Sequence, residues 1–399
     1  KEMLWSFSTS VSLILLIRNI FQQAFATIDD ARLLYVYAGY ATGTPTGNYL
    51  FSHPIFGSVI AWFYKNFPQF NWYYYQHMFL ILIFLTILGQ YIYYKLDRSR
   101  IEKILIHLFI VFVYCLNSLL ILHFEETASL TGCAALILLF GYEHYESRII
   151  TFFRSFGSYV LLVLCYMQEK NTFYALSCFL ILLLFIKFIY RLKEPNSRSK
   201  HQFQNIVIVS ILLLISVILL SLSKSYFHRS DQWKIYLEYN PYRISYWDYP
   251  NDPFDTNPAK YLNAGWSKEF YQLTNKMYFL DSRFTKEGLE KIVDKFDRTS
   301  SGVEDATFSS AFCTIFNALR NEPKARSQVV FLCFMVIVFF VILLIYKKPK
   351  RTFSDRLRFL TIVLACSGMF ILLMYLGWRG RLPLRAWDAV MLTCVTVVI

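Results

Sequence analysis

Apolar stretches of about 17–20 residues recur along this chain, and each is long enough to cross a bilayer as a helix. A spanning segment must pair all of its backbone polar groups internally, so long apolar runs predict a bundle of helices and exclude a barrel. Of all residues, 56% are hydrophobic and 19% are aromatic, which agrees with this class. The sequence therefore predicts an all-α integral membrane protein.

We expect about ten spans of this kind. They cover residues 4–21, 71–94, 104–121, 128–142, 149–165, 172–190, 205–223, 328–346, 357–376 and 386–399. The last is too short to cross and the sequence starts at Lys1, so we expect the natural protein to continue beyond both ends. The first span has no small-residue cleavage site, which favours a retained helix over a removed signal peptide.

The basic residues favour one orientation of the bundle. If the first span starts inside, the short inner connections hold 16 Lys and Arg residues and the short outer ones hold 6. The inner connections are 95–103, 143–148, 187–200 and 347–358, and the outer ones are 22–70, 122–127, 166–171 and 377–385. An excess of basic residues ordinarily marks the inner side. We therefore place loop 22–70 on the outer face of the plasma membrane, and we exclude nucleic acid as the partner of the +13 net charge.

Within the first outer loop, residues 52–67 predict a short helix along the membrane surface. Ser52 and Pro54 favour a helix start, and Pro68 ends it. Counting this segment as a span would invert the rest of the chain and move the basic connections outside.

A polar stretch at 224–327 predicts a folded α-rich extracytoplasmic domain. It carries 15 basic and 14 acidic residues over 224–326, with scattered apolar residues and a helical pattern over 282–296. The remaining parts are a transmembrane bundle at 1–223, which contains loop 22–70, and the C-terminal spans at 328–399.

Asp29 and Asp30 follow the first span and are the candidate catalytic residues. A carboxylate pair at an outer membrane surface can deprotonate an acceptor hydroxyl, or hold a divalent cation such as Mg²⁺ or Mn²⁺ near a phosphate. The structural alternative is a helix start, because Thr27 can cap a helix whose first turn favours acidic residues.

Further candidates lie near the same predicted surface. Glu125 and Glu126, next to His123, could complete a carboxylate cluster with the aspartates, although charged residues also mark the ends of ordinary spans. His53 and Tyr40 of the first loop could contribute to that cluster or hold an acceptor, since aromatic rings stack on sugars.

Arg379, Arg381 and Arg385 defy the charge bias that the rest of the chain obeys. Guanidinium groups match phosphate geometry and stay charged when partly buried, so these residues predict a site for a lipid-linked phosphate. Ion pairing with Asp388 or with loop acids is the structural alternative.

Several other classes are excluded. The sequence has no P-loop, dinucleotide fingerprint, HExxH motif or nucleophile elbow, which argues against a nucleotide-driven pump. Its 8 cysteines show neither zinc spacing nor a disulfide framework, and no cofactor is certain.

A retained first helix, an outer first loop with an acidic pair and a surface helix, many spans and a later arginine cluster together resemble the GT-C type of membrane glycosyltransferases. The local pattern DDARLLYVYAGYATGTPTGNYLFSHPIFG, with LEYNPYRISYWDYP, NAGWSKEFYQL and RGRLPLRAW, is similar to a group of multi-spanning bacterial proteins over nearly the whole chain. In the superfamily the first outer loop carries an acidic motif, of which Asp-Asp is one form, and polyprenyl-phosphate carriers usually donate the sugar. Asp29 or Asp30 would match that motif, whereas the arginines have no fixed counterpart.

The resemblance implies a glycosyltransferase, hexosyl or pentosyl, that moves sugar from a lipid-phosphate carrier to a cell-surface glycan, polymer or lipid on the outer face. Several superfamily members place a soluble domain at the C-terminus, whereas here the polar domain lies between spans. A polysaccharide polymerase of the many-span type and a lipid-linked glycan flippase remain alternatives. A flippase would favour ionisable residues near the middle of the bilayer, whereas Arg18 and His107 lie near the ends of their spans, which makes this the weaker alternative.

Overall fold

The structure is a computed structural model that describes residues 2–142, 148–193, 197–248, 253–275, 284–293, 308–321, 353–378 and 384–398, with 329, 330, 332, 333 and 337. The chain forms two compact units. The first comprises Lys1–Lys224, Glu322–Leu372 and Leu384–Ile399, and the second comprises Ser225–Asn321 and Leu373–Pro383.

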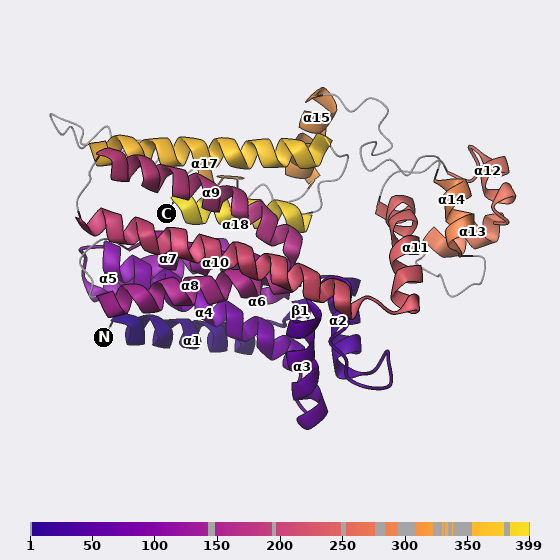
Figure 1. The fold of residues 1–399 in the computed structure, drawn as a ribbon, viewed down its shortest axis with the longest axis horizontal. Coiled ribbons are helices and arrows are strands. Elements are labelled where there is room, and N and C mark those ends of the chain that lie inside the picture. The colour runs from indigo at the N-terminus through magenta and orange to yellow at the C-terminus, as the bar shows by residue number, and fades with distance from the viewer. Residues whose placement is uncertain are drawn as a thin grey trace. The chain divides into compact units, whose positions relative to one another are not determined.

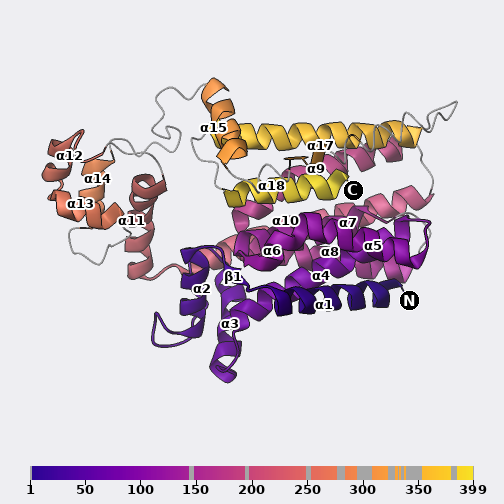
Figure 2. The ribbon, with the colours of Figure 1, turned by 180° about the vertical axis from the view of Figure 1, so that it is seen from behind.

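Long helices that pack side by side build the first unit, with their axes nearly aligned (Figures 1 and 2). The long helices are α1 (Glu2–Ile20), α4 (Trp72–Lys95), α7 (Phe124–Phe140), α8 (Arg148–Gln168), α9 (Lys170–Lys193), α10 (Ser197–Phe227), α17 (Phe353–Trp378) and α18 (Leu384–Val398). Helices α10 and α17 continue into the second unit. Two shorter helices, α2 (Ile28–Ala38) and α3 (Pro54–Asn66), run across the direction of the bundle at one end (Figure 1).

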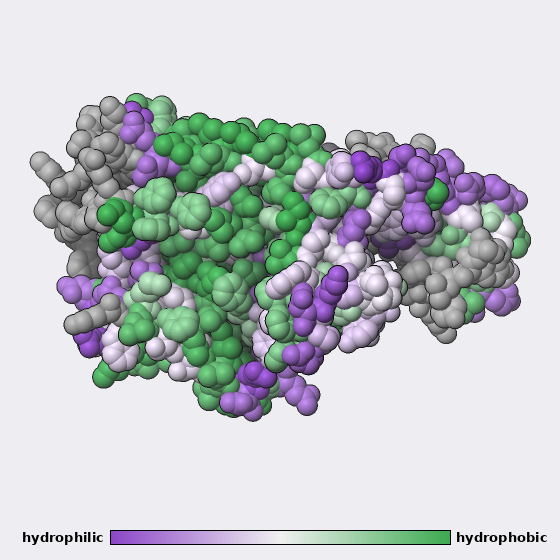
Figure 3. Space-filling model, turned by 60° about the horizontal axis from the view of Figure 1, so that its bottom comes forward, coloured by the Kyte–Doolittle hydropathy of each residue, from purple (hydrophilic) through white to green (hydrophobic). Residues whose placement is uncertain are grey.

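Six of the described helices are long and apolar enough to cross a membrane. They cover Glu2–Ile20, Trp72–Lys95, Ile149–Gln168, Lys170–Lys193, Phe203–Phe227 and Phe359–Trp378. Exposed apolar side chains cover much of the bundle face in Figure 3, as a surface in contact with lipid requires.

The expected count of ten spans is not confirmed. The predicted span 104–121 is helical but consists of α5 (Arg100–Ile110), a π-helical turn (Val111–Cys115) and α6 (Leu116–Leu120). Span 128–142 corresponds to α7, which has 17 residues, and span 386–399 corresponds to the short α18. Span 328–346 lies outside the described residues apart from a few positions.

A two-stranded parallel bridge closes one end of the first unit. Strand β1 (Ala24–Phe25) follows α1, and strand β2 (Ile121–Leu122) follows α6. Ala26 N also donates to Leu122 O over 2.9 Å, and His53 N donates to Met167 O over 2.7 Å. We call this the site end of the bundle. The predicted connections 22–70, 122–127 and 166–171 all meet there.

Helix α3 begins and ends close to where the sequence predicts. His53 caps it with Nδ1, which accepts from Ile55 N over 3.2 Å, and Pro54 occupies its first turn. Its 13 residues bury Ile60 and Tyr64 and expose Val59 and Trp62. An apolar face on both sides suits a helix at a membrane surface.

The loop before α3 packs against that helix through two glycines. A Cβ added to Gly47 would collide with backbone atoms of Gly57 and Ser58. We expect Gly47→Ala to lower the free energy of unfolding by about 1–3 kcal/mol, because the two backbones would have to separate. Thermal unfolding in detergent measures this. Gly368→Ala is the control, since nothing lies within 4 Å of its added Cβ. Equal melting of the Gly47 variant and the parent would contradict the close approach.

The second unit has its own aromatic core. It contains α11 (Asp231–Asp248), α12 (Pro258–Asn263), α13 (Lys268–Asn275), α14 (Lys286–Ile292) and α15 (Phe308–Asn321). Trp266 is fully buried, and its ring meets those of Tyr246 and Phe270 edge-on at 5.3 and 4.9 Å. The predicted helix 282–296 is observed as α14, with Leu289 and Ile292 buried. Residues 282, 283 and 294–296 lie outside the described part of the chain.

Candidate active site

The first turn of α2 carries the aspartate pair. Thr27 is its N-cap, and Thr27 Oγ1 accepts from Asp30 N over 3.4 Å. The same hydroxyl donates to Asp30 Oδ2 over 2.9 Å. The helix-start interpretation of Thr27 is therefore right, and acidic residues in this turn also interact favourably with the helix dipole.

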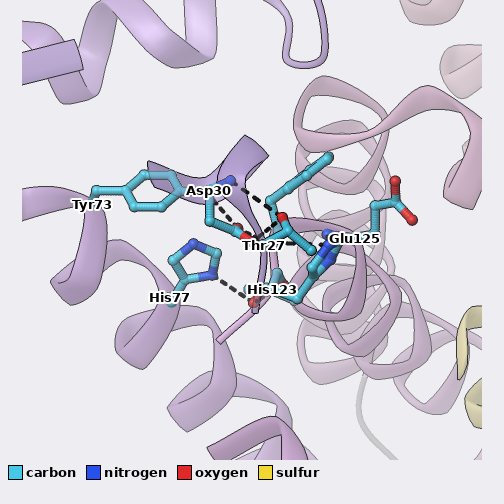
Figure 4. A network of polar contacts seen from close by, with 8 residues as sticks. Thr27, Asp30, Tyr73, His77, His123 and Glu125 are labelled. Atoms are coloured by element: carbon cyan, nitrogen blue, oxygen red, sulfur yellow. Dashed lines mark hydrogen bonds and ion pairs between the residues drawn. The ribbon is translucent and has the colours of Figure 1, made fainter. Parts of the chain in front are cut away.

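Asp30 is fully buried and joins three helices (Figure 4). Asp30 Oδ1 accepts from Tyr73 OH of α4 over 2.9 Å and from Phe124 N of α7 over 3.1 Å. His123 Nε2 lies 3.8 Å from Asp30 Oδ2. Because a buried carboxylate with this many donors is held rigidly, Asp30 fixes the start of α2 against α4 and α7.

Asp29 has a different environment from its neighbour. Its side chain keeps 23% of its surface exposed and lies 3.8 Å from Arg32 Nη1, one turn further along α2. Within the pair, Asp29 is therefore the carboxylate that a substrate can reach, and Asp30 is the one that the fold encloses.

The start of α7 repeats this arrangement. His123 caps the helix, Glu125 is half-buried, and Glu126 is buried with one oxygen accepting from Ser118 Oγ over 2.8 Å. Because Phe124 N donates to Asp30, the first turns of α2 and α7 are adjacent. The structure thus brings the two predicted acidic pairs to one place.

His53 and Tyr40 do not join this cluster through any contact between described residues that the structure shows. His53 is buried, and its Nε2 lies 2.9 Å from Leu220 O of α10. Burial lowers the pKa of His53, which favours a neutral ring. Tyr40 is 77% exposed and packs edge-on against Tyr35. His53 thus joins α3 to α10, and Tyr40 faces outward beyond α2.

Of the three candidate arginines, only the backbone of Arg385 is described. Arg379 and Arg381 lie outside the described residues, as does the Arg385 side chain. Helix α18 begins one residue earlier and packs on α7 and α9, and Cys133 Sγ lies 3.9 Å from Thr393 Oγ1. Figures 1 and 2 show α18 starting toward the end of the bundle where β1 lies. The start of α18 therefore lies toward the site end.

Within the described residues, no group of three or more His, Cys, Asp or Glu side chains is placed to hold a metal ion.

Two residues of the site were missed by sequence reasoning. Tyr73 lies 43 positions from Asp30 in a run that resembles an ordinary aromatic belt at the membrane interface. His77, one turn later in α4, is fully buried and binds Thr127 Oγ1 through Nδ1 over 2.6 Å. A histidine inside an apolar span was the available signal.

Burial makes Asp30 a titratable part of the fold. Desolvation raises its pKa from 3.8 to about 6, although bonds from Thr27, Tyr73 and Phe124 lower it. The unfolded chain therefore loses this proton at lower pH than the folded chain, and the contribution of Asp30 to stability falls as pH rises from about 4 to about 6. The contribution lost is about 3 kcal/mol.

We expect Asp30→Asn to remove this pH dependence, because the Asn carbonyl still accepts from Tyr73 and Phe124 but does not ionise. The measurement is the difference in melting temperature between parent and variant at pH 4 to 7.5. The melting temperature of the variant should rise relative to that of the parent as pH increases. A constant difference would show that Asp30 stays ionised in the fold throughout.

Comparison with known proteins gives one similarity. No family model matches the sequence, and no curated relative matches it. Among solved structures, the chain is similar to the crystal structure of ArnT from Cupriavidus metallidurans in the apo state, with a TM-score of 0.40 and 10% sequence identity over 98% of this chain and 75% of that chain. At this TM-score and identity the match assigns no function to the chain.

Proposed function

We propose that this chain is a membrane glycosyltransferase of the GT-C type, which transfers a sugar from a polyprenyl-phosphate carrier to an acceptor hydroxyl on the outer face. One observation carries the proposal. Asp29 is a reachable carboxylate in the first turn of a helix, and its neighbour Asp30 is locked to α4 and α7. A general base acts best from a rigid element that holds it in place.

The reaction assigns a separate task to each group. Asp29 takes the proton of the acceptor hydroxyl while the hydroxyl oxygen bonds to the anomeric carbon of the donor. The bond from that carbon to the carrier's phosphate oxygen breaks on the opposite side, so the configuration inverts. Arg379, Arg381 and Arg385 stabilise the negative charge of the departing phosphate. Glu125 lies in the first turn of α7, which adjoins the first turn of α2, and is a second carboxylate available to orient the acceptor.

The fate of the lipid carrier tests the proposal. Purified protein is reconstituted with a bacterial lipid extract that contains polyprenyl-phosphate-linked sugars, and the lipids are followed by mass spectrometry. A transferase releases the free carrier and attaches one sugar to an acceptor. A polymerase would instead lengthen the carrier-bound glycan.

A flippase would leave every lipid-linked sugar chemically intact. The flippase remains an alternative because His77 and His107 are buried inside the bundle. Ionisable residues in such positions often mark a transport path. Intact donor after prolonged incubation with the active, folded protein would reject the transferase.

A further inference from the structure

His123 is an unusual choice for the position that it occupies. Its ring is buried, and Nδ1 accepts from Glu125 N over 3.1 Å, so it serves as the N-cap of α7. Ser, Thr, Asp and Asn are the preferred residues at such positions. What an imidazole adds to a cap is a second ring nitrogen, so the partner of that nitrogen indicates why histidine is present.

The second nitrogen of His123 faces a carboxylate. Because Nδ1 accepts a hydrogen bond, the neutral ring carries its hydrogen on Nε2. That atom lies 3.8 Å from Asp30 Oδ2, with both side chains buried. This separation is too long for a strong hydrogen bond, but it is short enough for the Nε2–H dipole to act on the buried carboxylate.

His53 provides the comparison within the same chain. It caps α3 in the same way, with Nδ1 accepting from Ile55 N, and it is equally buried. Its Nε2, however, lies 2.9 Å from the carbonyl oxygen of Leu220 and faces no carboxylate. The two caps therefore differ mainly in the charge of the group opposite Nε2.

A second imidazole borders this junction. Thr127 Oγ1 donates to His123 O over 3.0 Å, so its hydrogen is used, and His77 Nδ1 must donate to that hydroxyl over 2.6 Å. His77 Nε2 is left as an acceptor, buried and with no hydrogen-bond partner among the described residues. The His77 ring therefore borders the junction through Thr127.

The titratable groups that the described contacts place around His123 come from three helices. Helix α2 contributes Asp30, and α4 contributes Tyr73, which donates to Asp30, and His77. On α7 itself, Glu125 is half-buried and Glu126 accepts from Ser118 of α6. Among these groups, Asp30 is the carboxylate that forms an ion-pair contact with His123.

We propose that His123 and Asp30 form a buried imidazole–carboxylate couple, and that His123 is a positioning residue for the proposed transfer. The neutral ring caps α7 through Nδ1 and directs its Nε2–H toward Asp30, which holds the turn of α2 that carries Asp29. An N–H group that faces a buried carboxylate favours the ionised form, so the titration of Asp30 depends on this ring. Only the positioning role rests on the proposed function.

The first experiment needs no substrate. Infrared difference spectra of the whole protein, recorded from pH 4 to 8, follow the C=O stretch of protonated Asp30, which subtraction of Asp30→Asn spectra isolates. His123→Asn keeps the cap but removes the imidazole. Without the Nε2–H that faces the carboxylate, the ionised form of Asp30 is less favoured, and the midpoint of the Asp30 band should move up by about one pH unit. His53→Asn is the matched control and should leave the band in place. Equal midpoints in parent and His123→Asn would overturn the couple.

The second experiment tests positioning, with the reconstituted transfer assay. His123→Asn should lower kcat and displace the acid limb of its pH profile, with little change in the donor KM and in the melting temperature. If the Asp30 band moves in His123→Asn but the parent shows no turnover, the couple is supported and the proposed function is rejected. If the parent turns over normally and His123→Asn has the same kcat and pH profile, the proposed function is supported and the positioning role is rejected.

Discussion

Replacing Asp29 by Asn is expected to slow sugar transfer by about 10²–10⁴-fold, the usual contribution of a general base. The melting temperature should hardly change, because Asp29 is partly exposed and its ion contact with Arg32 is a surface pair that contributes little to stability. The fold should stay intact because the start of α2 is held by Thr27 and Asp30, which the substitution leaves in place. Release of free carrier in the mass-spectrometric assay gives the rate.

Two further variants separate the base from its neighbours. Asp29→Glu keeps a carboxylate but moves it, so partial activity should remain. Glu125→Gln should raise the acceptor KM more than it lowers kcat, since we assign Glu125 to orientation. Transfer at the parent's rate by Asp29→Asn would leave Asp29 without a catalytic role.

Substitution of the arginines is expected to have the second largest effect. Arg→Lys at position 379, 381 or 385 should weaken binding of a polyprenyl-phosphate analogue by about tenfold, which corresponds to ~1.4 kcal/mol. An ammonium group is a point charge and cannot reproduce the two parallel hydrogen bonds of a guanidinium fork. Part of the loss should be recovered at low salt, where the remaining charge is less screened.

Arg191→Lys provides the control for charge and for helix context. Arg191 lies in the last turn of α9 and stacks over Phe203 at 5.0 Å, so lysine there should leave binding of the analogue unchanged. If the lysine variants at 379, 381 and 385 bind the analogue and turn over like the parent, these arginines do not bind the donor's phosphate.

The helices were largely predictable from the sequence, and their internal irregularities were not. Apolar length alone located α1, α4 and α8, since a long apolar run has few alternatives to a spanning helix. The π-helical turn at Val111–Cys115 interrupts a run of the same character, and nothing in the apolar pattern distinguishes these residues from their neighbours.

The sequence predicted which residues form the candidate site, but not which of the two aspartates is buried and which is accessible. The sequence marked both aspartates, yet their burial depends on which face of α2 packs inward. A usable signal was present: Asp30 shares its helical face with Leu33 and Tyr37, which are buried, whereas Asp29 does not. The contact with Tyr73 had no such signal, because nothing in the pattern links positions 43 residues apart.

The hydrogen bonds to Asp30 determine when this end of the bundle can assemble during synthesis. Asp30 and Phe124 are 94 residues apart, so a ribosome that adds 5–20 residues per second leaves Asp30 without its α7 partner for roughly 5–20 s. The parallel bridge between β1 and β2 must wait for the same segment. During that interval the carboxylate has to remain in water or keep its proton, since burying it unpaired would be costly. The end of the bundle that carries the acidic residues therefore closes only after α7 has been made, and a chain released before Phe124 could not assemble it.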